Sequence, residues 1–434
     1  MLRQNYGLAF WERTMMISKA GVAAVLTAIA TSSACAEPRV SAISQWSAGN
    51  DGAAMNAFGE LVTKAGAKWE HNPVSGPFTD LLNKLRADLI AGRPPAVSQL
   101  KGPEIKAWSA LAPTVNLDSL VAEAGYEKLV SADLAKIHKP NGNWIALPLQ
   151  VFRINTLYAS KKAMDRIGET ALPRTWDEYN SMAKKFQEAG ITPVAHGGLG
   201  WIDTQLFDVV LSGMSPAVYK KAIEGLDDKS LRGPEVLAAL IQLRQMSKWM
   251  NPSNAGQHWS LAIPGLMKGE YGFLIMGSWA SGVLKRGKFE EGADFLCGAA
   301  PNNTGKPVFD MNSDGLIFWD TKNPDYAEGQ KITAKVAMGT EFGKLFTQIN
   351  GSLPARSDID LSDAAYQECQ RDGAKNLSGA IAADQVVMSL GQNMAQSSAV
   401  TGALRDVITE FVHNDSITPD VAQKRLADAA DSVR

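Results

Sequence analysis

The sequence predicts an α/β protein with mostly parallel sheets, and two observations carry this prediction. Near the N-terminus, short apolar runs alternate with amphipathic helical segments, which is typical of βαβ units. The length of 434 residues exceeds what one hydrophobic core usually organises, so we expect two domains. The composition is that of a folded chain, with 45% hydrophobic and 20% charged residues. A net charge of −2 offers no basic surface, so no nucleic-acid partner is expected.

The first βαβαβ segment lies between residues 39 and 100. Its predicted elements are a strand at 39–44, a helix at 55–65, a strand at 68–71, a helix at 78–89 and a strand at 96–100. Both helices carry apolar residues at helical spacing, and the second ends at the sequence Gly-Arg-Pro-Pro that follows it.

The later elements follow from the same patterns. They are strands within 141–148, 152–158, 191–195, 273–276 and 309–319, helical stretches at 175–190, 203–250 and 326–348, and a mostly helical remainder. Thr175 is the clearest helix start, because Glu178 follows three residues later and completes a capping box. We expect the strand at 152–158 to cross between the domains.

The first 36 residues are expected to be a secretory signal peptide. Lys19 precedes a short apolar run at 21–30, and Ala34-Cys35-Ala36 forms an A-x-A cleavage site before Glu37. The apolar run is too short to span a bilayer. We therefore expect an exported, periplasmic protein whose mature chain begins at Glu37.

Cleavage of this peptide would leave Cys297 and Cys369 as the cysteines of the mature chain. In an oxidising compartment they would form one disulfide or remain two buried thiols. We favour the disulfide, because each cysteine lies near a Gly- or Asp-rich turn region rather than inside a long apolar run.

The strand at 273–276 is the most informative element for function. Gly277-Ser278-Trp279 follows it directly, which places an aromatic ring at the carboxyl end of a central strand. Open α/β sheets bind their ligands at that end. The alternative is a tryptophan that only packs in the core.

Aromatic and polar residues recur at other strand-to-helix turns. They are Trp46, Asp51, Gln99, Lys101, Trp201 and Asp314. Aromatic planes stack on the C–H faces of sugars, and short polar side chains bind sugar hydroxyl groups. This set therefore favours a carbohydrate pocket.

Residues for catalysis or cofactor binding are not recognisable in the sequence. It contains no Walker P-loop and no GxGxxG motif that opens a helix after a strand. The five histidines are scattered, without the spacing of metal ligands. No nucleophile stands out, so we expect no enzyme, no cofactor and no metal site.

Six segments carry a resemblance to a known family. They are QWSAGNDG (45–52), NGNWIALPL (141–149), LPRTWDEY (172–179), GEYGFLIMGSWASG (269–282), MNSDG (311–315) and NGSLPAR (350–356). On these segments the mature chain resembles the extracellular solute-binding proteins of bacterial ABC sugar importers. It is most similar to the branch that binds glucose and mannose. The GSW and GSLPAR elements are the most specific of these motifs.

The resemblance implies two α/β lobes joined by a hinge that closes on a ligand. The N-terminal lobe would comprise residues 37–149 and 312–356, and the C-terminal lobe residues 150–311 and 357–434. The implied ligand-binding residues are Trp46, Asp51, Gln99, Lys101, Asn155, Trp201, Gln205, Trp279, Asp314, Arg356 and Ser378. The implied partners are a small-molecule sugar and the permease and ATPase subunits of the importer, and the protein would act as a monomer.

Two departures from this branch argue against glucose. Gln45 precedes a single Trp46 where the branch carries paired aromatic residues, and Ser378 stands in place of a histidine. A different hexose, a sugar alcohol, a small glycoside or an oligosaccharide stays open, as does an acidic sugar bound by Lys101 and Arg356. The alternative functions are an exported carbohydrate-active enzyme and the binding of a non-sugar solute such as a polyamine.

Overall fold

The strands of the described residues form three sheets. The computed structural model describes residues 37–251, 253 and 255–434. The predicted signal peptide lies outside these residues. No helix within the described ranges is long and apolar enough to cross a membrane.

The first sheet has five strands in the order β2-β1-β3-β11-β4. They are β1 (Arg39–Ser44), β2 (Lys68–Pro73), β3 (Val97–Lys101), β4 (Ala146–Pro148) and β11 (Asp314–Phe318). β1 runs parallel to both β2 and β3, and helices α1 (Gly49–Lys64) and α2 (Phe78–Ile90) connect these strands. The predicted βαβαβ segment is therefore confirmed.

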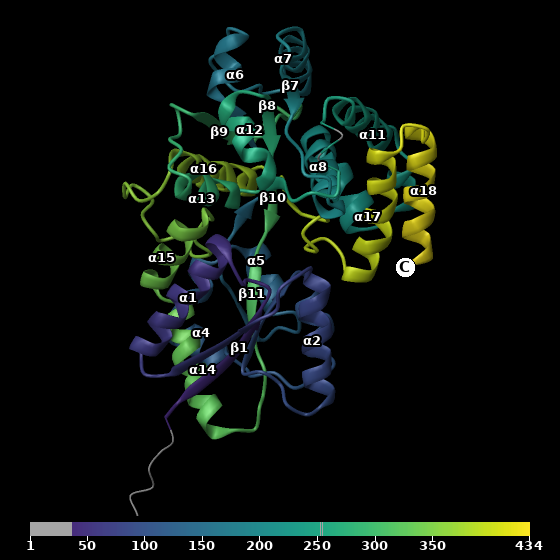
Figure 1. Ribbon diagram of the computed structural model, residues 1–434. Coiled ribbons are helices and arrows are strands. Elements are labelled where there is room, and N and C mark those ends of the chain that lie inside the picture. Colours follow the sequence, from purple (N-terminus) through teal and green to yellow (C-terminus); the bar gives the residue numbers. More distant parts are fainter. Residues whose placement is uncertain (1–36, 252, 254) are drawn as a thin grey trace, which may run out of the picture. The chain divides into compact units, whose positions relative to one another are not determined.

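Alternating side chains of the first sheet face two hydrophobic layers, as the two-residue period of a strand requires. Val40 and Ala42 pack with α1, α14 (Pro324–Ala337) and α15 (Thr340–Asn350). Ile43 packs on the other face with α2 and α3 (Pro103–Ser109). Figure 1 shows α14 and α2 on opposite sides of β1.

The second sheet has four strands in the order β7-β8-β6-β9. They are β6 (Thr156–Ser160), β7 (Thr192–Val194), β8 (Tyr271–Ile275) and β9 (Phe295–Ala299). β8 lies between β7 and β6, so the prediction of a central strand here is confirmed. Phe273 stacks on Tyr179 of α7 (Trp176–Glu188), whereas Leu274 points to the opposite layer with α12 (Ile263–Lys268) and α13 (Trp279–Arg286).

A third, small sheet has the strand order β12-β10-β5, and the chain passes from it directly into each of the other two sheets. Its strands are β5 (Phe152–Arg153), β10 (Phe309–Asn312) and β12 (Val386–Met388). The strands predicted at 152–158 and 309–319 are each two strands, because β5 continues into β6 of the second sheet and β10 into β11 of the first. Polar residues mark both breaks, Asn155 at the first and Asn312-Ser313-Asp314 at the second, but each was interpreted as part of one strand or as its entry.

Three chain crossings are hydrogen-bonded side by side at these breaks. The Leu149 N–H donates to the Asp314 carbonyl at 2.8 Å, and Val151 and Leu353 exchange backbone hydrogen bonds at 2.9 and 2.8 Å. The Ser313 hydroxyl donates to the Gln150 carbonyl at 2.7 Å. Such a bundle of short connections can bend as one unit. The predicted lobe boundaries at 149, 312 and 356 stay a prediction.

In each of the two larger sheets of the described residues, all strands but one run in the same direction, so the prediction of mostly parallel sheets is confirmed, with one antiparallel strand in each. β11 is antiparallel to β3 and β4, and β6 is antiparallel to β8 and β9. Both β11 and β6 begin where the chain has just crossed from another sheet. Each strand therefore enters its sheet at the end where the chain crosses between sheets, and so it runs opposite to the strands beside it.

Helices make up most of the remaining chain. They are α4 (Asp118–Glu123), α5 (Ala132–His138), α6 (Lys161–Arg166), α8 (Gly200–Met214), α9 (Pro216–Tyr219), α10 (Asp228–Leu231), α11 (Pro234–Ser247), α16 (Glu368–Ala382), α17 (Ser398–His413) and α18 (Pro419–Ser432), with 3₁₀ turns at Tyr126–Leu129 and Trp259–Ala262 and a π turn at Lys220–Glu224. α17 packs between α8 and α18 (Figure 1). The helix predicted at 326–348 is two helices, α14 and α15, because Gly339 interrupts it.

The capping box predicted for α7 is half formed. Thr175 Oγ1 accepts a hydrogen bond from the Glu178 backbone N–H at 3.2 Å. The Glu178 carboxylate accepts instead from the Arg174 backbone N–H at 2.7 Å. The predicted helix start is therefore confirmed. The Glu178 carboxylate, however, accepts from Arg174, whereas a capping box requires the backbone N–H of the N-cap residue Thr175.

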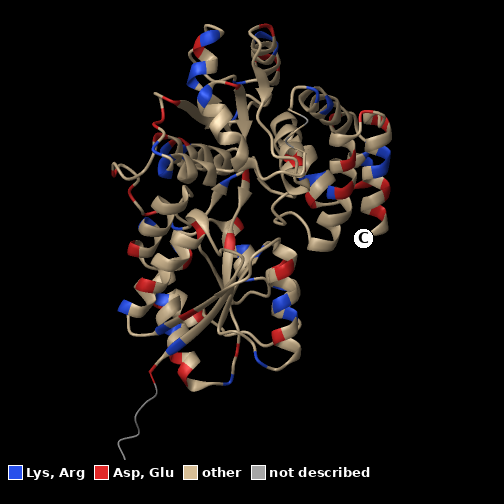
Figure 2. Cartoon of the chain, viewed as in Figure 1, with Lys and Arg blue, Asp and Glu red and all other residues tan. Residues whose placement is uncertain are grey.

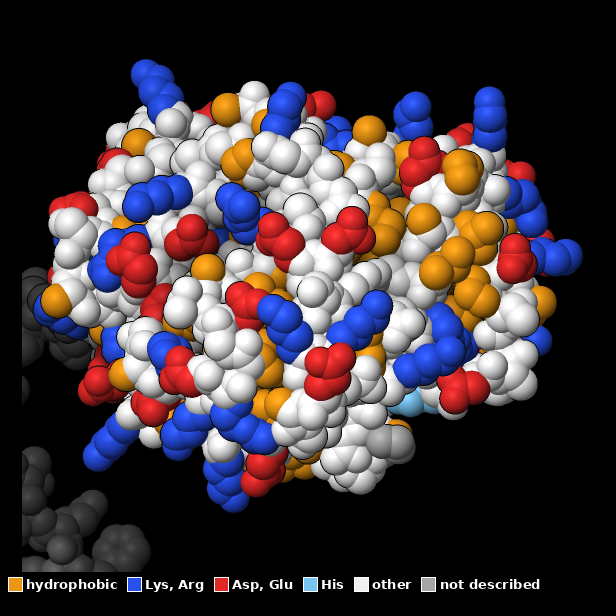
Figure 3. Space-filling model, turned by 90° about the horizontal axis from the view of Figure 1, so that it is seen from above, with side chains coloured by type: hydrophobic (Ala, Val, Ile, Leu, Met, Phe, Trp, Pro, Cys, Tyr) orange, Lys and Arg blue, Asp and Glu red, His pale blue; other side chains and the backbone are white. Residues whose placement is uncertain are grey.

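Charged side chains of both signs are interspersed over the helices (Figure 2). The face drawn in Figure 3 also shows Lys and Arg beside Asp and Glu. This mixture follows from nearly equal totals, 43 basic and 45 acidic residues. It creates no strong attraction for a polyanion.

Candidate ligand-binding site

The carboxylate of Asp314 is the centre of a buried group of polar side chains. Asp314 begins β11 and lies opposite Lys101, the last residue of β3. Gln99 Nε2 donates to Asp314 Oδ1 at 2.7 Å, and Gln150 Nε2 donates to Oδ2 at 2.8 Å. Lys101 Nζ lies 4.0 Å from Oδ1. These donors offset part of the free energy needed to remove a carboxylate from water.

We call Asp314, Gln99, Lys101, Gln150 and Asn312 the polar cluster. Gln150 Oε1 and Asn312 Oδ1 are buried and have no hydrogen-bond partner in the part of the chain that the structure describes. A buried polar atom without a partner costs about 1–3 kcal/mol. The cluster can therefore accept hydrogen bonds from hydroxyl groups of a ligand.

Asp51 lies close to this cluster, in the first turn of α1. Burial and the negative charge of Asp314 raise the pKa of Asp51 to about 7, and Lys101 and Arg286 oppose this shift. Burial likewise lowers the pKa of Lys101. The Lys101 ammonium lies 4.8 Å from the centre of the Phe78 ring, an arrangement that favours its charged form. Acidic and basic groups thus lie within electrostatic reach of one another here.

Aromatic side chains form a second group, on the second sheet. Trp279 begins α13 after the three residues that follow β8, and its ring packs edge-on against Phe152 with centroids 5.2 Å apart. Trp201, in the first turn of α8, has its ring centroid 6.2 Å from that of Trp279. Both tryptophans are partly exposed. Gly277 lets the Trp279 ring lie against the backbone, because a Cβ at this position would collide with the ring.

The two groups meet at the third sheet. Asn312 of β10 is paired with Phe152 of β5 in the antiparallel register. The Asn312 amide reaches Asp314 Oδ2 at 3.4 Å, and the Phe152 ring packs on Trp279. A polar region and an aromatic region are therefore adjacent at the chain crossings.

Gln205 lies on the aromatic side, and Arg405 lies near Lys101 of the polar cluster. Gln205 is buried one helical turn after Trp201, with Nε2 3.8 Å from Met276 Sδ and Oε1 3.5 Å from Gln392 Nε2. These contacts are long, so the Gln205 amide is weakly engaged. The positive charge of Arg405 contributes to the lowered pKa of Lys101, which places the two cations near each other.

Two predicted site residues have partners elsewhere. The Arg356 guanidinium donates to both carboxylate oxygens of Asp358, at 2.6 and 2.8 Å, and to the Met338 carbonyl. Ser378 is exposed on α16, and its hydroxyl donates to the Ala374 carbonyl at 3.1 Å. The structure does not bring either residue to the polar cluster, because each finds a local partner. Their roles in binding stay predictions.

Two further predicted residues are engaged in packing. The Asn155 amide donates to the Val308 carbonyl and accepts from the Asp310 backbone N–H, both at 2.9 Å. Trp46 is buried, with its ring centroid 5.6 Å from that of Phe346. Both polar atoms of the Asn155 amide are thus engaged within the fold, and the Trp46 ring packs in the core.

Several residues near the site were not predicted from the sequence. They are Gln150, Asn312, Arg286, Gln392 and Arg405. Gln150 directly follows the motif NGNWIALPL, and Asn312 lies within the motif MNSDG, so their positions were a usable signal. The other residues belong to helices and loops with no local pattern, and only the tertiary fold brings them here.

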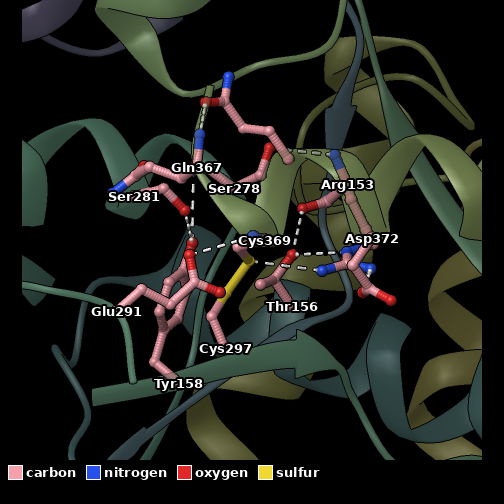
Figure 4. The surroundings of a disulfide bond; sticks show 11 residues. Arg153, Thr156, Tyr158, Ser278, Ser281, Glu291, Cys297, Gln367, Cys369 and Asp372 are labelled. Atoms are coloured by element: carbon pink, nitrogen blue, oxygen red, sulfur yellow. Dashed lines mark hydrogen bonds and ion pairs between the residues drawn. A yellow bond between two sulfur atoms is a disulfide. The ribbon is translucent and has the colours of Figure 1, made fainter. Parts of the chain in front are cut away.

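A disulfide joins Cys297 of β9 to Cys369 of α16, with Cα atoms 5.6 Å apart (Figure 4). Arg153 of β5 donates to Asp372 Oδ2 at 2.7 Å and points Nη2 at Cys369 Sγ, 3.6 Å away. The bond closes a loop of 72 residues, which corresponds to about 4 kcal/mol of stabilisation. It fastens α16 to the second sheet beside a chain crossing.

Residues 47–329 match the family described as bacterial extracellular solute-binding protein. The chain belongs to this family. A probable sugar-binding periplasmic protein of Mesorhizobium japonicum is 32% identical over 95% of this chain and 98% of its own length. One of Rhizobium meliloti is 30% identical over 97% and 100%. A chitin oligosaccharide binding protein superposes with a TM-score of 0.77 at 19% identity, covering 91% of this chain and 98% of that structure.

The solute-binding protein therefore has the two-lobed α/β fold of its structural neighbours. Its family binds solutes, so it is a binding protein and not an enzyme. Among its described residues, no group of three or more His, Cys, Asp or Glu side chains is placed to hold a metal ion.

Proposed function

We propose that this solute-binding protein captures a sugar between its two lobes in the periplasm, which it reaches through the signal peptide at 1–36. It then delivers the sugar, as a monomer, to the permease and ATPase subunits of an ABC importer. Relatives named as probable sugar-binding periplasmic proteins support this proposal, as does a relative named as an ABC transporter extracellular-binding protein.

The adjacency of the polar cluster and the Trp279 ring is the observation that carries the proposal. A sugar has apolar C–H faces and a rim of hydroxyl groups, and it needs both kinds of partner. Trp279 offers a partly exposed ring. Asp314 and the free amide oxygens of Gln150 and Asn312 offer acceptors for hydroxyl protons, and Lys101 offers a donor.

The charges of the site favour a neutral sugar. Arg356, which would have bound an acidic sugar together with Lys101, is paired with Asp358. Lys101 itself lies 4.0 Å from Asp314. A polyamine fits less well, because Lys101 and Arg405 would repel its ammonium groups. The acceptors that remain free suit uncharged hydroxyl donors.

A thermal-shift and calorimetric panel tests this function. The purified protein is titrated with neutral mono- and disaccharides, uronic acids and putrescine. A sugar at a hundred times its dissociation constant should add about 2.7 kcal/mol to the free energy of unfolding. Ser432→Ala serves as a control variant, because its side chain is exposed on α18 and its hydroxyl donates only to the local Ala429 carbonyl among the described residues, and it should bind like the wild type. Stabilisation by putrescine alone, or by no sugar in the panel, would contradict the proposal.

A further inference from the structure

The two residues of β5, Phe152 and Arg153, connect the candidate ligand site with the disulfide. Successive residues of a strand point to opposite faces. Phe152 packs on the Trp279 ring, with centroids 5.2 Å apart, and is paired with Asn312 of the polar cluster. The Arg153 side chain lies beside Cys369 instead (Figure 4). One short strand therefore borders both regions.

The Arg153 guanidinium is buried and has three side-chain partners. Nε donates to Thr156 Oγ1 at 3.1 Å, Nη1 to Asp372 Oδ2 at 2.7 Å and Nη2 to Cys369 Sγ at 3.6 Å. Asp372 and Cys369 both belong to α16, which the disulfide joins to Cys297 of β9. The position of Arg153 therefore depends on where the disulfide holds the start of α16.

The backbone of Arg153 is bonded to the residue that precedes Trp279. Its N–H donates to Ser278 Oγ at 3.3 Å, and the Ser278 N–H donates to the Arg153 carbonyl at 2.9 Å. Ser278 is the N-cap residue of α13, and Trp279 is the first residue of that helix. A shift of Arg153 would therefore also shift the start of α13 and the Trp279 ring.

The disulfide is accessible from the protein surface on one side. Cys297 is partly exposed and lines a surface pocket of about 680 Å³, together with Phe289 and Tyr366. Cys369 is buried. A thiolate that enters this pocket can therefore attack Cys297 Sγ, and Cys369 is then the leaving group.

Reduction by a dithiol proceeds in two exchanges. A thiolate of the dithiol attacks Cys297 Sγ, the S–S bond breaks, and its electron pair leaves on Cys369 Sγ. This sulfur faces the Arg153 guanidinium, which favours a thiolate there, although Asp372 shares the same cation. The second sulfur of the dithiol then displaces Cys297 from the mixed disulfide. The dithiol leaves as a disulfide, and its two protons pass to the two cysteine sulfurs.

We propose that Arg153 is a positioning residue for the sugar site and that the disulfide sets its position, so that reduction by a dithiol lowers sugar affinity. This inference rests on the proposed sugar-binding function. In the oxidised protein α16 is tied to β9, and Arg153 holds Ser278 and Trp279 in the binding arrangement. In the reduced protein the start of α16 is released, and Arg153 is no longer held against it.

Calorimetry in both oxidation states tests the coupling. The oxidised protein and the protein reduced with dithiothreitol are titrated with neutral mono- and disaccharides, and circular dichroism shows whether each is folded. Reduction should weaken binding of the tightest-binding sugar about tenfold, the equivalent of one hydrogen bond. Equal affinity of two folded states would overturn the inference and leave the proposed function intact. Binding of no sugar by the oxidised protein would overturn both.

The reduction potential provides a second readout, which a disulfide without influence on the site would not change. Binding that is tenfold tighter in the oxidised state means that saturating sugar lowers the midpoint potential of the disulfide by about 30 mV. Thiol alkylation in dithiothreitol redox buffers, with and without the sugar, measures this shift. The same potential under both conditions would contradict the coupling.

Arg153→Lys tests the connecting residue with the disulfide intact. Lysine keeps the charge but lacks the planar fork that reaches three partners. The oxidised variant should bind sugar about tenfold more weakly, and reduction should then change its affinity by less than about twofold. This reading is available even if the reduced wild type fails to fold.

Arg244→Lys is the matched control for this variant. Arg244 is also buried and pairs with one exposed aspartate, Asp415, at 2.9 Å. It should bind sugar like the wild type and lose the same affinity on reduction. Wild-type affinity of oxidised Arg153→Lys, or a full tenfold loss when that variant is reduced, would overturn the role of Arg153.

Discussion

The two sheets that border the candidate site contribute opposite chemistry. The first sheet ends in the polar cluster, whose side chains are buried and hydrogen-bonded to one another around Asp314. The second sheet ends in partly exposed tryptophan rings with few polar partners. The polar side is buried and centred on one carboxylate, whereas the aromatic side is partly exposed. The first sheet should therefore orient the sugar and select for its hydroxyl groups, and the second sheet should provide most of the contact area.

The two sides also differ in how they are held together. The disulfide fastens α16 to the second sheet, and the first sheet depends on packing and hydrogen bonds. Replacing both Cys297 and Cys369 by Ser should lower the free energy of unfolding by about 4 kcal/mol, as measured by urea denaturation. This is the largest expected effect. The reductant dithiothreitol should destabilise the wild type similarly and leave the double variant unchanged. Equal stability of wild type and double variant would contradict this role.

Asp314→Asn tests the polar side. The substitution keeps the shape of the side chain and removes the charge that Gln99, Gln150 and Lys101 surround. Sugar affinity should fall about 10- to 100-fold, since hydrogen bonds to a charged group are worth about 1.5–3 kcal/mol. Asp358→Asn is the matched control, because that exposed carboxylate pairs only with Arg356. Equal sugar affinities of the two variants in isothermal titration calorimetry would contradict the assignment of Asp314 to the binding site.

Asp51 makes the polar side sensitive to pH. Its folded pKa of about 7 exceeds the ordinary value of 3.8, so the folded protein holds this proton more tightly than the unfolded chain. The associated stability is fully present below about pH 4 and is lost as the pH rises through about 7. Asp51→Asn cannot ionise, so it should raise the thermal midpoint at pH 8 and change it little at pH 4. An identical shift of the thermal midpoint at both pH values would contradict the raised pKa of Asp51.

Sequence patterns predicted the strand-end residues well. Gln99 and Lys101 were predicted at the end of a strand and Asp314 at the turn that enters another, and they lie together because β11 begins beside the end of β3, to which it is antiparallel. The central strand before Trp279 was predictable from its apolar run. Local signals were sufficient at these positions.

Other features depend on tertiary contacts that no local pattern records. The passage from β10 to β11 runs through the polar residues Asn312, Ser313 and Asp314, which were interpreted as the turn that enters one strand and not as the point where two sheets meet. Arg356 sits in a specific motif, yet it bonds to Asp358, two residues away. Gln150 was missed because an amide within a crossing segment resembles any other polar residue. Partners across the fold decide the role of such side chains.

The central claim is that a polar side and an aromatic side hold the same sugar. Sugar titration of Trp279→Ala, with the thermal midpoint of the unliganded variant measured in parallel, tests it most directly. The account predicts that binding falls at least about 10-fold, since an aromatic contact contributes about 0.5–1.5 kcal/mol beyond the burial of its area. The unliganded variant should still unfold cooperatively, because Trp279 is partly exposed. A variant that binds sugar like the wild type, or one that no longer folds, would contradict the claim.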